Sequence, residues 1–266
     1  MRKALLLSGL QRNFLPFVKN QLELLIKGND FDIFISTSCE NNNRCSDQNG
    51  RITYKDSTPI ETNQDYFKEL YGDYIKDIVI DDGSLYEKFK EENNIPDITK
   101  FHEGLIKSYL KVYLGIKMIE KYEIENKIRY DFIVRARLDC FLIEKLNINQ
   151  ILSSLRYNEL IFSENERGHK DDSCFFCNRD HVHIFRDFVF HVVKKANNIF
   201  TLGSSEEIKI EITLFDYCWE RGYFFTFKQN IIGRIGCPDI KFKNLPFFQK
   251  EDLSKLSSLE YSIEYE

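Results

Sequence analysis

The chain has 266 residues and a formal net charge of −5; 42% of its residues are hydrophobic and 30% are charged. These values are typical of a globular protein with room for a large core. The acidic balance argues against a nucleic-acid-binding protein, because the neutralisation of phosphates requires clustered Lys and Arg. Since no apolar run approaches the roughly 18 residues of a membrane span, we expect a cytoplasmic protein without a transmembrane segment.

The N-terminal part of the chain predicts a β-α-β unit, in which a helix joins two parallel strands. Residues 3–7 form a short apolar run, and residues 31–36 have the pattern of a second strand. Between them, apolar residues recur with helical spacing over residues 13–26. Such a unit opens an α/β fold.

The turn after the first strand contains Ser8, Gly9 and Arg12. In a β-α-β unit this turn attracts anions, because backbone N–H groups and the start of the helix face it. The sequence matches neither the glycine fingerprint of dinucleotide-binding folds nor a P-loop. We therefore expect an anion site of another kind at this turn, formed by a hydroxyl, a glycine and a guanidinium. The alternative is a purely structural turn, which is the more common case.

Alternating elements follow up to residue 119. Residues 38–58 are polar and rich in turn residues, which predicts a long surface loop. Asp81 and Asp82 end a predicted strand, where they either contact a ribose or a metal or form a solvated turn. The other expected elements are a helix at 66–71, a strand at 75–80, a helix at 85–92 and an amphipathic helix at 105–119.

The most informative pattern lies in residues 130–142. Aromatic and β-branched residues alternate as in a buried strand, and then Arg135, Arg137 and Asp139 occupy every second position. In a strand this spacing points all three side chains to one face. Two cations and a carboxylate at the carboxyl end of a strand suit a phosphorylated ligand with a metal ion. An Arg–Asp ion pair at a surface strand end fits the spacing equally well.

A polar segment at residues 163–173 contains many titratable groups and no apolar residue. We expect it to be a loop anchored by a strand on each side, either facing solvent or forming part of a site. Asp171 and Asp172 are its candidate catalytic or acceptor-binding carboxylates, and Glu211 on a later helix is a third. Cys174 and Cys177 form a C-x-x-C inside an apolar strand, which favours reduced thiols over zinc.

The sequence contains no internal repeat and no linker rich in Pro, Gly or Ser. We therefore expect a single domain over residues 1–266, with a core of about 1–235 and a wrapping tail at 236–266. Its remaining elements are a helix at 148–155, a strand at 159–162, a helix that starts from an Asn178 cap, a helix from a Ser204–Glu207 capping box to Trp219 and a strand at 223–227.

Several of these motifs, in this order along about residues 1–235, resemble glycosyltransferases of the GT-A type. More narrowly, they resemble the small proteins of bacterial surface-polysaccharide clusters and large DNA viruses whose central motif is Arg-x-Arg-x-Asp. The resemblance implies a GT-A-like (Rossmann-like), mostly parallel central sheet with helices on both faces. The motifs that carry it are Ser8-Gly9-x-x-Arg12, the segment Tyr130 to Asp139, and Asp171-Asp172 before a short strand.

The resemblance also implies an activity: transfer of a sugar from a nucleotide-diphosphate sugar to a glycan or another hydroxyl acceptor. In GT-A enzymes an Asp-x-Asp motif holds Mn²⁺ or Mg²⁺ against the diphosphate. Asp139 then takes the metal-binding role, while Arg137 replaces the first Asp and either leaves one carboxylate for the metal or neutralises the diphosphate itself. The implied donor-binding residues are Ser8, Gly9, Arg12, Arg135, Arg137 and Asp139.

An inverting enzyme also needs a carboxylate that deprotonates the acceptor, and Asp171, Asp172 and then Glu211 are the candidates. Two other functions stay open. A metal-dependent nucleotidyltransferase or phosphohydrolase would need a second carboxylate cluster, such as Asp81 and Asp82. A non-catalytic nucleotide-sugar-binding protein would keep the donor site alone.

Overall fold

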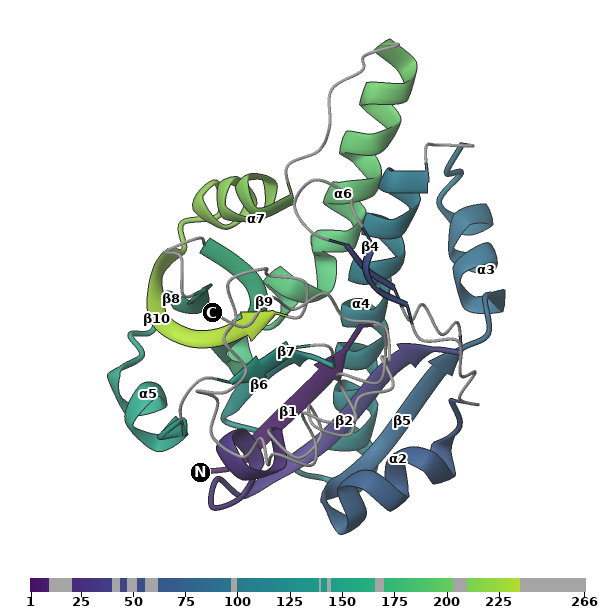
Figure 1. Ribbon diagram of the computed structural model, residues 1–266. Helices are drawn as coiled ribbons and strands as arrows, with labels where there is room; N and C mark the ends of the chain where they lie inside the picture. Colours follow the sequence, from purple (N-terminus) through teal and green to yellow (C-terminus); the bar gives the residue numbers. More distant parts are fainter. Residues whose placement is uncertain are drawn as a thin grey trace.

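The computed structural model describes residues 1–9, 21–39, 44–46, 52–55, 62–96, 100–138, 140–142, 145–165, 170–202 and 210–234. Within these ranges the chain forms an eight-stranded sheet, helices on both of its faces and a separate two-stranded sheet (Figure 1). Across the large sheet the strands are β5 (Ile75–Asp81), β2 (Phe31–Ser38), β1 (Lys3–Ser8), β6 (Phe132–Arg137), β9 (Lys170–Asn178), β8 (Glu159–Asn165), β10 (Phe224–Arg234) and β7 (Cys140–Leu142).

The large sheet is mostly parallel. β5, β2, β1 and β6 pair in parallel, and so do β8 and β10. Only β9, between β6 and β8, and β7, at the edge beside β10, run in the opposite direction. The predicted α/β fold with a mostly parallel sheet is therefore confirmed, and the Arg-x-Arg strand β6 lies in its middle.

Two long helices cover one face of the sheet, α4 (Lys100–Asn126) and α6 (His183–Leu202) (Figure 1). The apolar stripe of α4 packs on side chains such as Leu6 and Phe34 from the first two strands. Gly115 allows close contact here, because a Cβ at this position would overlap the side chain of Leu6. The burial of this stripe explains why the helix forms where its 3.6-residue pattern predicts it.

The opposite face of the sheet packs against shorter helices, so helices cover both faces as predicted. Leu5, Leu7 and Ile35 point to this side, since alternate residues of a strand face opposite ways. The elements on this face are η1 (Leu22–Ile26), α2 (Gln64–Tyr71) and α5 (Ile148–Ser154). The other helices described are η2 (Gly72–Tyr74), α3 (Ser84–Glu92), η3 (Arg179–His181) and α7 (Ile210–Trp219).

Two predicted loops contain strands instead. Within residues 38–58, β3 (Arg44–Ser46) and β4 (Ile52–Lys55) pair antiparallel. In the segment 163–173, β8 continues to Asn165 and β9 starts at Lys170, so Asp171 and Asp172 lie in a strand. The prediction of a loop was wrong because backbone hydrogen bonds extend a hairpin whether or not its side chains are apolar.

Asn178 does not cap the helix predicted to start there. It precedes the short helix η3, and α6 begins only at His183. The Asn178 side chain instead donates to the carbonyl groups of Arg156 and Tyr157, at 3.4 and 3.3 Å. The prediction failed because these long-range contacts orient the Asn178 amide, and its side chain accepts no hydrogen bond from the backbone at the start of η3.

The helices predicted at 66–71, 85–92, 105–119 and 148–155 are all present, and α4 is longer than predicted. Of the helix predicted at 13–26, the described part is a short π-helix, η1. The capping box at Ser204 and Glu207 and the tail at 236–266 lie outside the described residues. Among the helices described, none is both long enough and apolar enough to span a bilayer.

Candidate functional site

The carboxyl ends of β1, β2, β5 and β6 meet at one edge of the sheet, which we call the switch edge. From β1 the chain continues to β2 on one side and later enters β6 on the other, so the strand order reverses at β1. Ligands of open α/β sheets bind outside the carboxyl ends of the strands at such a reversal. Ser8 and Arg137 pair across it, which brings two of the predicted site residues together.

Ser8 and Arg135 are joined by a buried hydrogen bond at this edge. Arg135 Nε donates to Ser8 Oγ at 2.9 Å, and the two residues are 1% and 0% exposed. The guanidinium also lies over the ring of Phe175, with its Cζ 6.0 Å from the ring centroid. Since Ser8 Oγ accepts this bond, its own O–H is directed elsewhere and keeps its capacity to donate.

Gly9 forms the turn after β1 with a positive φ of 127°, which side chains with a Cβ rarely adopt. Its N–H donates to the Ser36 carbonyl at 3.1 Å, and its carbonyl accepts from Thr37 Oγ1 at 2.7 Å. The turn is also held on the β6 side, where Leu138 N–H donates to the Ser8 carbonyl at 3.2 Å. The backbone of the predicted anion-binding turn is therefore fixed from both neighbouring strands.

Ser36 and Ser38 add two hydroxyl groups to the switch edge. Both residues are buried, and their Oγ atoms have no hydrogen-bond partner among the residues that the structure describes. Ser36 pairs with Ser8, so both side chains lie on the α4 face of the sheet, as Leu6 and Phe34 do two residues earlier. A buried hydroxyl without a partner costs about 1–3 kcal/mol, which a hydrogen bond to a ligand would offset.

Gln21 and Tyr71 hold the end of β6 from the other face, and we call this pair the Gln21 clamp. Gln21 is fully buried, and its Nε2 donates to the carbonyl groups of Arg137 and Leu138 at 3.2 and 3.4 Å. Its Oε1 accepts from Tyr71 Oη at 2.9 Å. The clamp fixes the backbone immediately before Asp139, the predicted metal ligand.

Asp81 and Asp82 are used by their own turn at the end of β5. Asp81 Oδ1 accepts from the N–H groups of Gly83 and Leu85 at 2.8 and 3.1 Å. Hydrogen bonds from the Ser84 side chain and backbone hold the pKa of Asp82 below its ordinary value. These contacts are those of a structural turn at the start of α3, the second of the two interpretations of this motif.

Four of the predicted residues, Ser8, Gly9, Arg135 and Arg137, are brought together at the switch edge, and Arg137 is half-buried there. Arg12 and Asp139 lie outside the described residues, and the side chains of Asp171, Asp172 and Glu211 are not described. The backbone of Asp171 pairs with Ser163, beyond the pair of Ala136 with Cys174. Because β9 is antiparallel to β6, its start extends past the carboxyl end of β6.

Sequence reasoning missed Gln21, Ser36, Ser38 and Tyr71. The run Ser36-Thr37-Ser38 at the end of an apolar strand was a usable signal, because polar residues there lie at the ligand edge of an α/β sheet. Nothing in the sequence indicates that Gln21 and Tyr71 meet, since 50 residues separate them.

Cys174 and Cys177 do not face a common centre. Cys174 packs in the core on the α5 side of the sheet and Cys177 in the core under α4 and α6, so their thiols point to opposite faces. Burial raises the pKa of Cys177, which keeps the thiol protonated. Both are free thiols, in agreement with the expectation of reduced cysteines.

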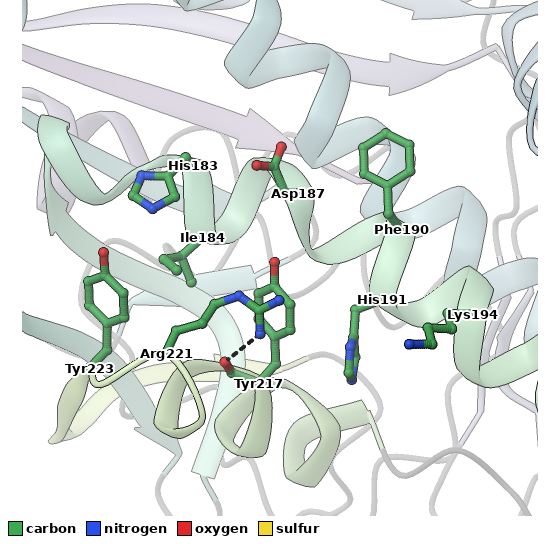
Figure 2. Close-up of a pocket in the computed structure, with 9 residues that line it drawn as sticks. All are labelled: His183, Ile184, Asp187, Phe190, His191, Lys194, Tyr217, Arg221 and Tyr223. Atoms are coloured by element: carbon green, nitrogen blue, oxygen red, sulfur yellow. Dashed lines mark hydrogen bonds between the residues drawn. The ribbon is translucent and has the colours of Figure 1, made fainter.

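A separate groove of about 730 Å³ lies between α6 and the end of α7 (Figure 2). Tyr223, one of its lining residues, immediately precedes β10. β10 is parallel to β8, which is antiparallel to β9 and hence parallel to β6, so this residue lies at the amino ends of the strands. The groove is therefore distinct from the switch edge.

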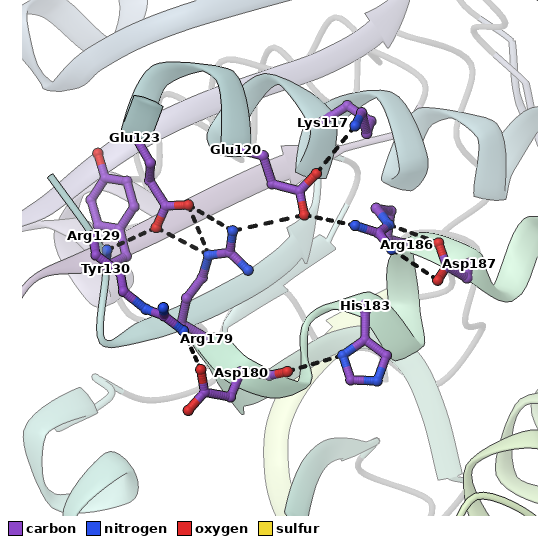
Figure 3. A network of polar contacts seen from close by, with 10 residues as sticks. All are labelled: Lys117, Glu120, Glu123, Arg129, Tyr130, Arg179, Asp180, His183, Arg186 and Asp187. Atoms are coloured by element: carbon purple, nitrogen blue, oxygen red, sulfur yellow. Dashed lines mark hydrogen bonds and ion pairs between the residues drawn. The ribbon is translucent and has the colours of Figure 1, made fainter. Parts of the chain in front are cut away.

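The amino-end side of the sheet also contains a network of charged side chains (Figure 3). Arg179 Nε and Nη2 donate to Glu123 Oε2 at 2.9 and 2.7 Å, and Glu123 Oε1 accepts the Tyr130 N–H at 2.9 Å. Arg186 Nη1 donates to Glu120 at 2.9 Å, which links α6 to α4. We call Glu120, Glu123, Arg179, Arg186 and Asp187 the ion-pair network.

No family model matches the chain, and no curated protein matches it. Among solved structures, HddC from Yersinia pseudotuberculosis is 12% identical with a TM-score of 0.44, over 92% of this chain and 98% of that one. The apo form of the glycosyltransferase GlyE from Streptococcus pneumoniae TIGR4 is 10% identical with a TM-score of 0.39; 85% of this chain spans 45% of GlyE. The 4-diphosphocytidyl-2C-methyl-D-erythritol synthase of Anaerococcus prevotii DSM 20548 is 9% identical with a TM-score of 0.42, over 97% of both chains. Such values are too low to assign a shared activity.

Proposed function

We propose that the protein is a nucleotide-sugar-dependent glycosyltransferase of the GT-A type whose donor binds at the switch edge. The observation that supports it is the collection of hydroxyl groups there: Ser8, oriented by Arg135, and Ser36 and Ser38, which lack partners among the described residues. Glycosyl transfer releases a nucleoside diphosphate, and stabilising its developing negative charge is a main task of the site. Hydroxyl donors and guanidinium groups supply that stabilisation.

The two arginines of β6 take different parts in this proposal. Arg135 is 1% exposed and bonded to Ser8, so it positions the serine hydroxyl instead of meeting the donor itself. Arg137 is half-buried at the end of β6 and is the cation that neutralises the diphosphate. An Arg suits this task because its planar guanidinium binds phosphate oxygens in pairs. Arg12 would add a second cation from the turn after Gly9.

The acceptor is a hydroxyl group of a glycan or a similar molecule. Asp171 and Asp172 are the proposed residues for its deprotonation in an inverting reaction, with Glu211 as the third candidate. In a retaining reaction the same carboxylates would position the acceptor. The extension of β9 past the carboxyl end of β6 supports this assignment, because the Asp171 backbone then lies on the same side of the sheet as the switch edge.

A Mn²⁺ or Mg²⁺ ion at Asp139 belongs to the proposal as a separate part. Among the described side chains, no three His, Cys, Asp or Glu residues gather in a way that would hold a metal ion. In this proposal the Asp139 carboxylate would hold the ion together with phosphate oxygens and waters. Arg137 neutralises the diphosphate with or without this ion, and the comparison of Mn²⁺ with EDTA below tests the metal.

The central experiment measures thermal stabilisation of the full chain by UDP-, GDP-, CDP- and dTDP-linked sugars, each with Mn²⁺ and with EDTA. A donor at 100 times its Kd adds about 2.7 kcal/mol to the free energy of unfolding. Arg137→Gln should abolish the shift, whereas Arg129→Gln, an exposed arginine outside the switch edge, should retain it. No shift with any donor in either condition would contradict the proposal.

A second measurement separates the transferase from the other two functions. A transferase releases nucleoside diphosphate when a suitable acceptor is added, and Asp171→Asn with Asp172→Asn should stop the release without loss of donor binding. A nucleotidyltransferase or phosphohydrolase would instead lose activity in Asp82→Ala and keep it in Asp139→Ala. Asp81 and Asp82 already bind backbone groups of their turn, so no observation favours that function.

A further inference from the structure

The groove between α6 and the end of α7 has the size and chemistry of a ligand site (Figure 2). Its volume of about 730 Å³ falls in the range of small-molecule sites, roughly 300–1,000 Å³. The residues of α6 line one side, while Tyr217 and Arg221 come from the other (Figure 2). The full lining is His183, Ile184, Asp187, Phe190, His191, Lys194, Tyr217, Arg221 and Tyr223.

Positive charge dominates this lining. Lys194 and Arg221 are exposed, and within the described ranges neither forms an ion pair. The one carboxylate in the lining, Asp187, is already paired, since Arg186 donates to its two oxygens at 2.7 and 3.0 Å. Among the described side chains, no carboxylate therefore serves as counter-ion to these two cations, and the groove can accept an anionic ligand.

Arg221 is held ready for such an anion. Its guanidinium carbon lies 3.6 Å from the centroid of the Tyr217 ring, and its Nη1 donates to the Tyr217 carbonyl at 3.2 Å. This carbonyl bond occupies one of the five N–H groups of the guanidinium. A cation that is already ordered loses less conformational entropy on binding than a mobile one.

The surroundings of His191 show the same positive potential. Its pKa is lowered by burial first and then by the charges of Lys195 and Arg221; Glu220 opposes this effect, and Lys194 contributes the smallest lowering. Its ring lies beside Tyr217, with the centroids 4.8 Å apart. Phe190, which is 39% exposed, adds an apolar wall. Cations near a partly exposed aromatic ring suit a ligand with a charged group on a compact body.

We propose that this groove is a second ligand site, for a saccharide that carries a phosphate or carboxylate group. The anionic group lies against Arg221, Lys194 and His191, and the sugar ring lies against Phe190, while Tyr223 is at the opposite end of the groove (Figure 2). The site does not depend on the function proposed for the switch edge, because the two lie at different ends of the strands.

The test follows the His191 imidazole by NMR in the full chain labelled with ¹⁵N-histidine, at 150 mM NaCl so that unspecific attraction is screened. Glucose 6-phosphate, glucuronic acid, inorganic phosphate and glucose are titrated in turn, and His191→Gln identifies the signal. A bound anion within about 4–6 Å favours the imidazolium, so the pKa of His191 should rise by about one unit in a saturable manner. Neutral glucose should leave it unchanged.

Two variants localise the response. Arg221→Gln and Lys194→Gln should each weaken binding about tenfold, whereas Lys88→Gln, an exposed lysine on α3, should not change it. If Arg221→Gln does not fold, Lys194→Gln alone provides the test, because Lys194 is exposed. An absent or non-saturable shift, or a shift that persists in both groove variants, overturns the proposal. Equal affinity for inorganic phosphate and glucose 6-phosphate overturns the saccharide part and leaves an anion site.

Discussion

The switch edge and the ion-pair network use the same kinds of residues in opposite ways. In the network, Glu123 accepts from Arg179 and from the Tyr130 backbone, and Arg186 is shared by Glu120 and Asp187 (Figure 3). At the switch edge, Ser36 and Ser38 are buried without partners among the described residues. Buried polar groups with hydrogen-bond partners stabilise a fold. Buried polar groups without partners lower its stability, and a hydrogen bond to a ligand can offset that loss.

The difference also separates the two kinds of arginine. Arg179 joins the end of β9 to α4, and its partners are carboxylates of the same protein. Arg135 is more deeply buried and its Nε meets a neutral hydroxyl, which is a weaker partner for a cation. We therefore expect stability to depend most on the network and ligand binding most on the switch edge.

The largest effect on stability is expected from Arg179→Met. The substitution leaves Glu123, which is 7% exposed, without its main counter-ion, and breaking a buried ion pair costs about 3 kcal/mol. Urea unfolding measures the loss. Lys117→Met is the control next to the network, because Lys117 is 53% exposed and its pair with Glu120 should contribute less than about 1 kcal/mol. Equal effects of the two substitutions would contradict the structural role of the network.

Ser8→Ala should destabilise the protein by about 2 kcal/mol, because the buried Nε of Arg135 loses its acceptor. The same variant should weaken the binding of the nucleotide-sugar donor, since the oriented hydroxyl is gone. Unfolding in urea and donor titration by calorimetry measure the two effects. Ser8→Cys, which keeps the size of the side chain, tests whether the hydroxyl itself is needed. Unchanged stability in Ser8→Ala would show that the Ser8–Arg135 bond contributes little.

Tyr71→Phe removes the hydroxyl that donates to Gln21 in the Gln21 clamp. We expect a loss of about 1 kcal/mol, the usual contribution of a single hydrogen bond. Because the clamp holds the carbonyl groups of Arg137 and Leu138, donor affinity should also fall. Tyr74→Phe is the control, since Tyr74 is 41% exposed. A loss of stability with full donor affinity would limit the clamp to a structural role.

Ser36→Ala should have the smallest effect on stability and the most informative one. Because its hydroxyl meets no partner among the described residues, its removal should change the free energy of unfolding by less than about 0.5 kcal/mol or raise it. Donor affinity should nevertheless fall roughly fivefold, the equivalent of one hydrogen bond. If stability falls and donor affinity does not, the Ser36 hydroxyl has a structural role, like the groups of the network, and is not part of the donor site.

Local patterns in the sequence predicted most elements of the fold. The alternation around residues 130–134 and the helical stripe at 105–119 show which side chains of a strand or helix are buried. Such patterns can be recognised because they involve only residues close together in the sequence. The prediction failed at residues 163–173, where polar side chains hide a strand pair held by backbone hydrogen bonds, and at Asn178, whose amide binds a distant carbonyl. Neither of these contacts has a local pattern.

By itself, the sequence determined the α/β class, the existence of the Arg-x-Arg strand and the polar turn at Ser8 and Gly9. Strand pairing decided the rest: it set Ser8 beside Arg137 and Ser36 and brought Gln21 under the end of β6. It also showed that Arg135 is buried against Ser8 while Arg137 remains half-exposed, although both have the same spacing in the chain. Periodicity gives the face to which a side chain points, but only the neighbouring strands and helices determine how deeply it is buried and which atoms it meets.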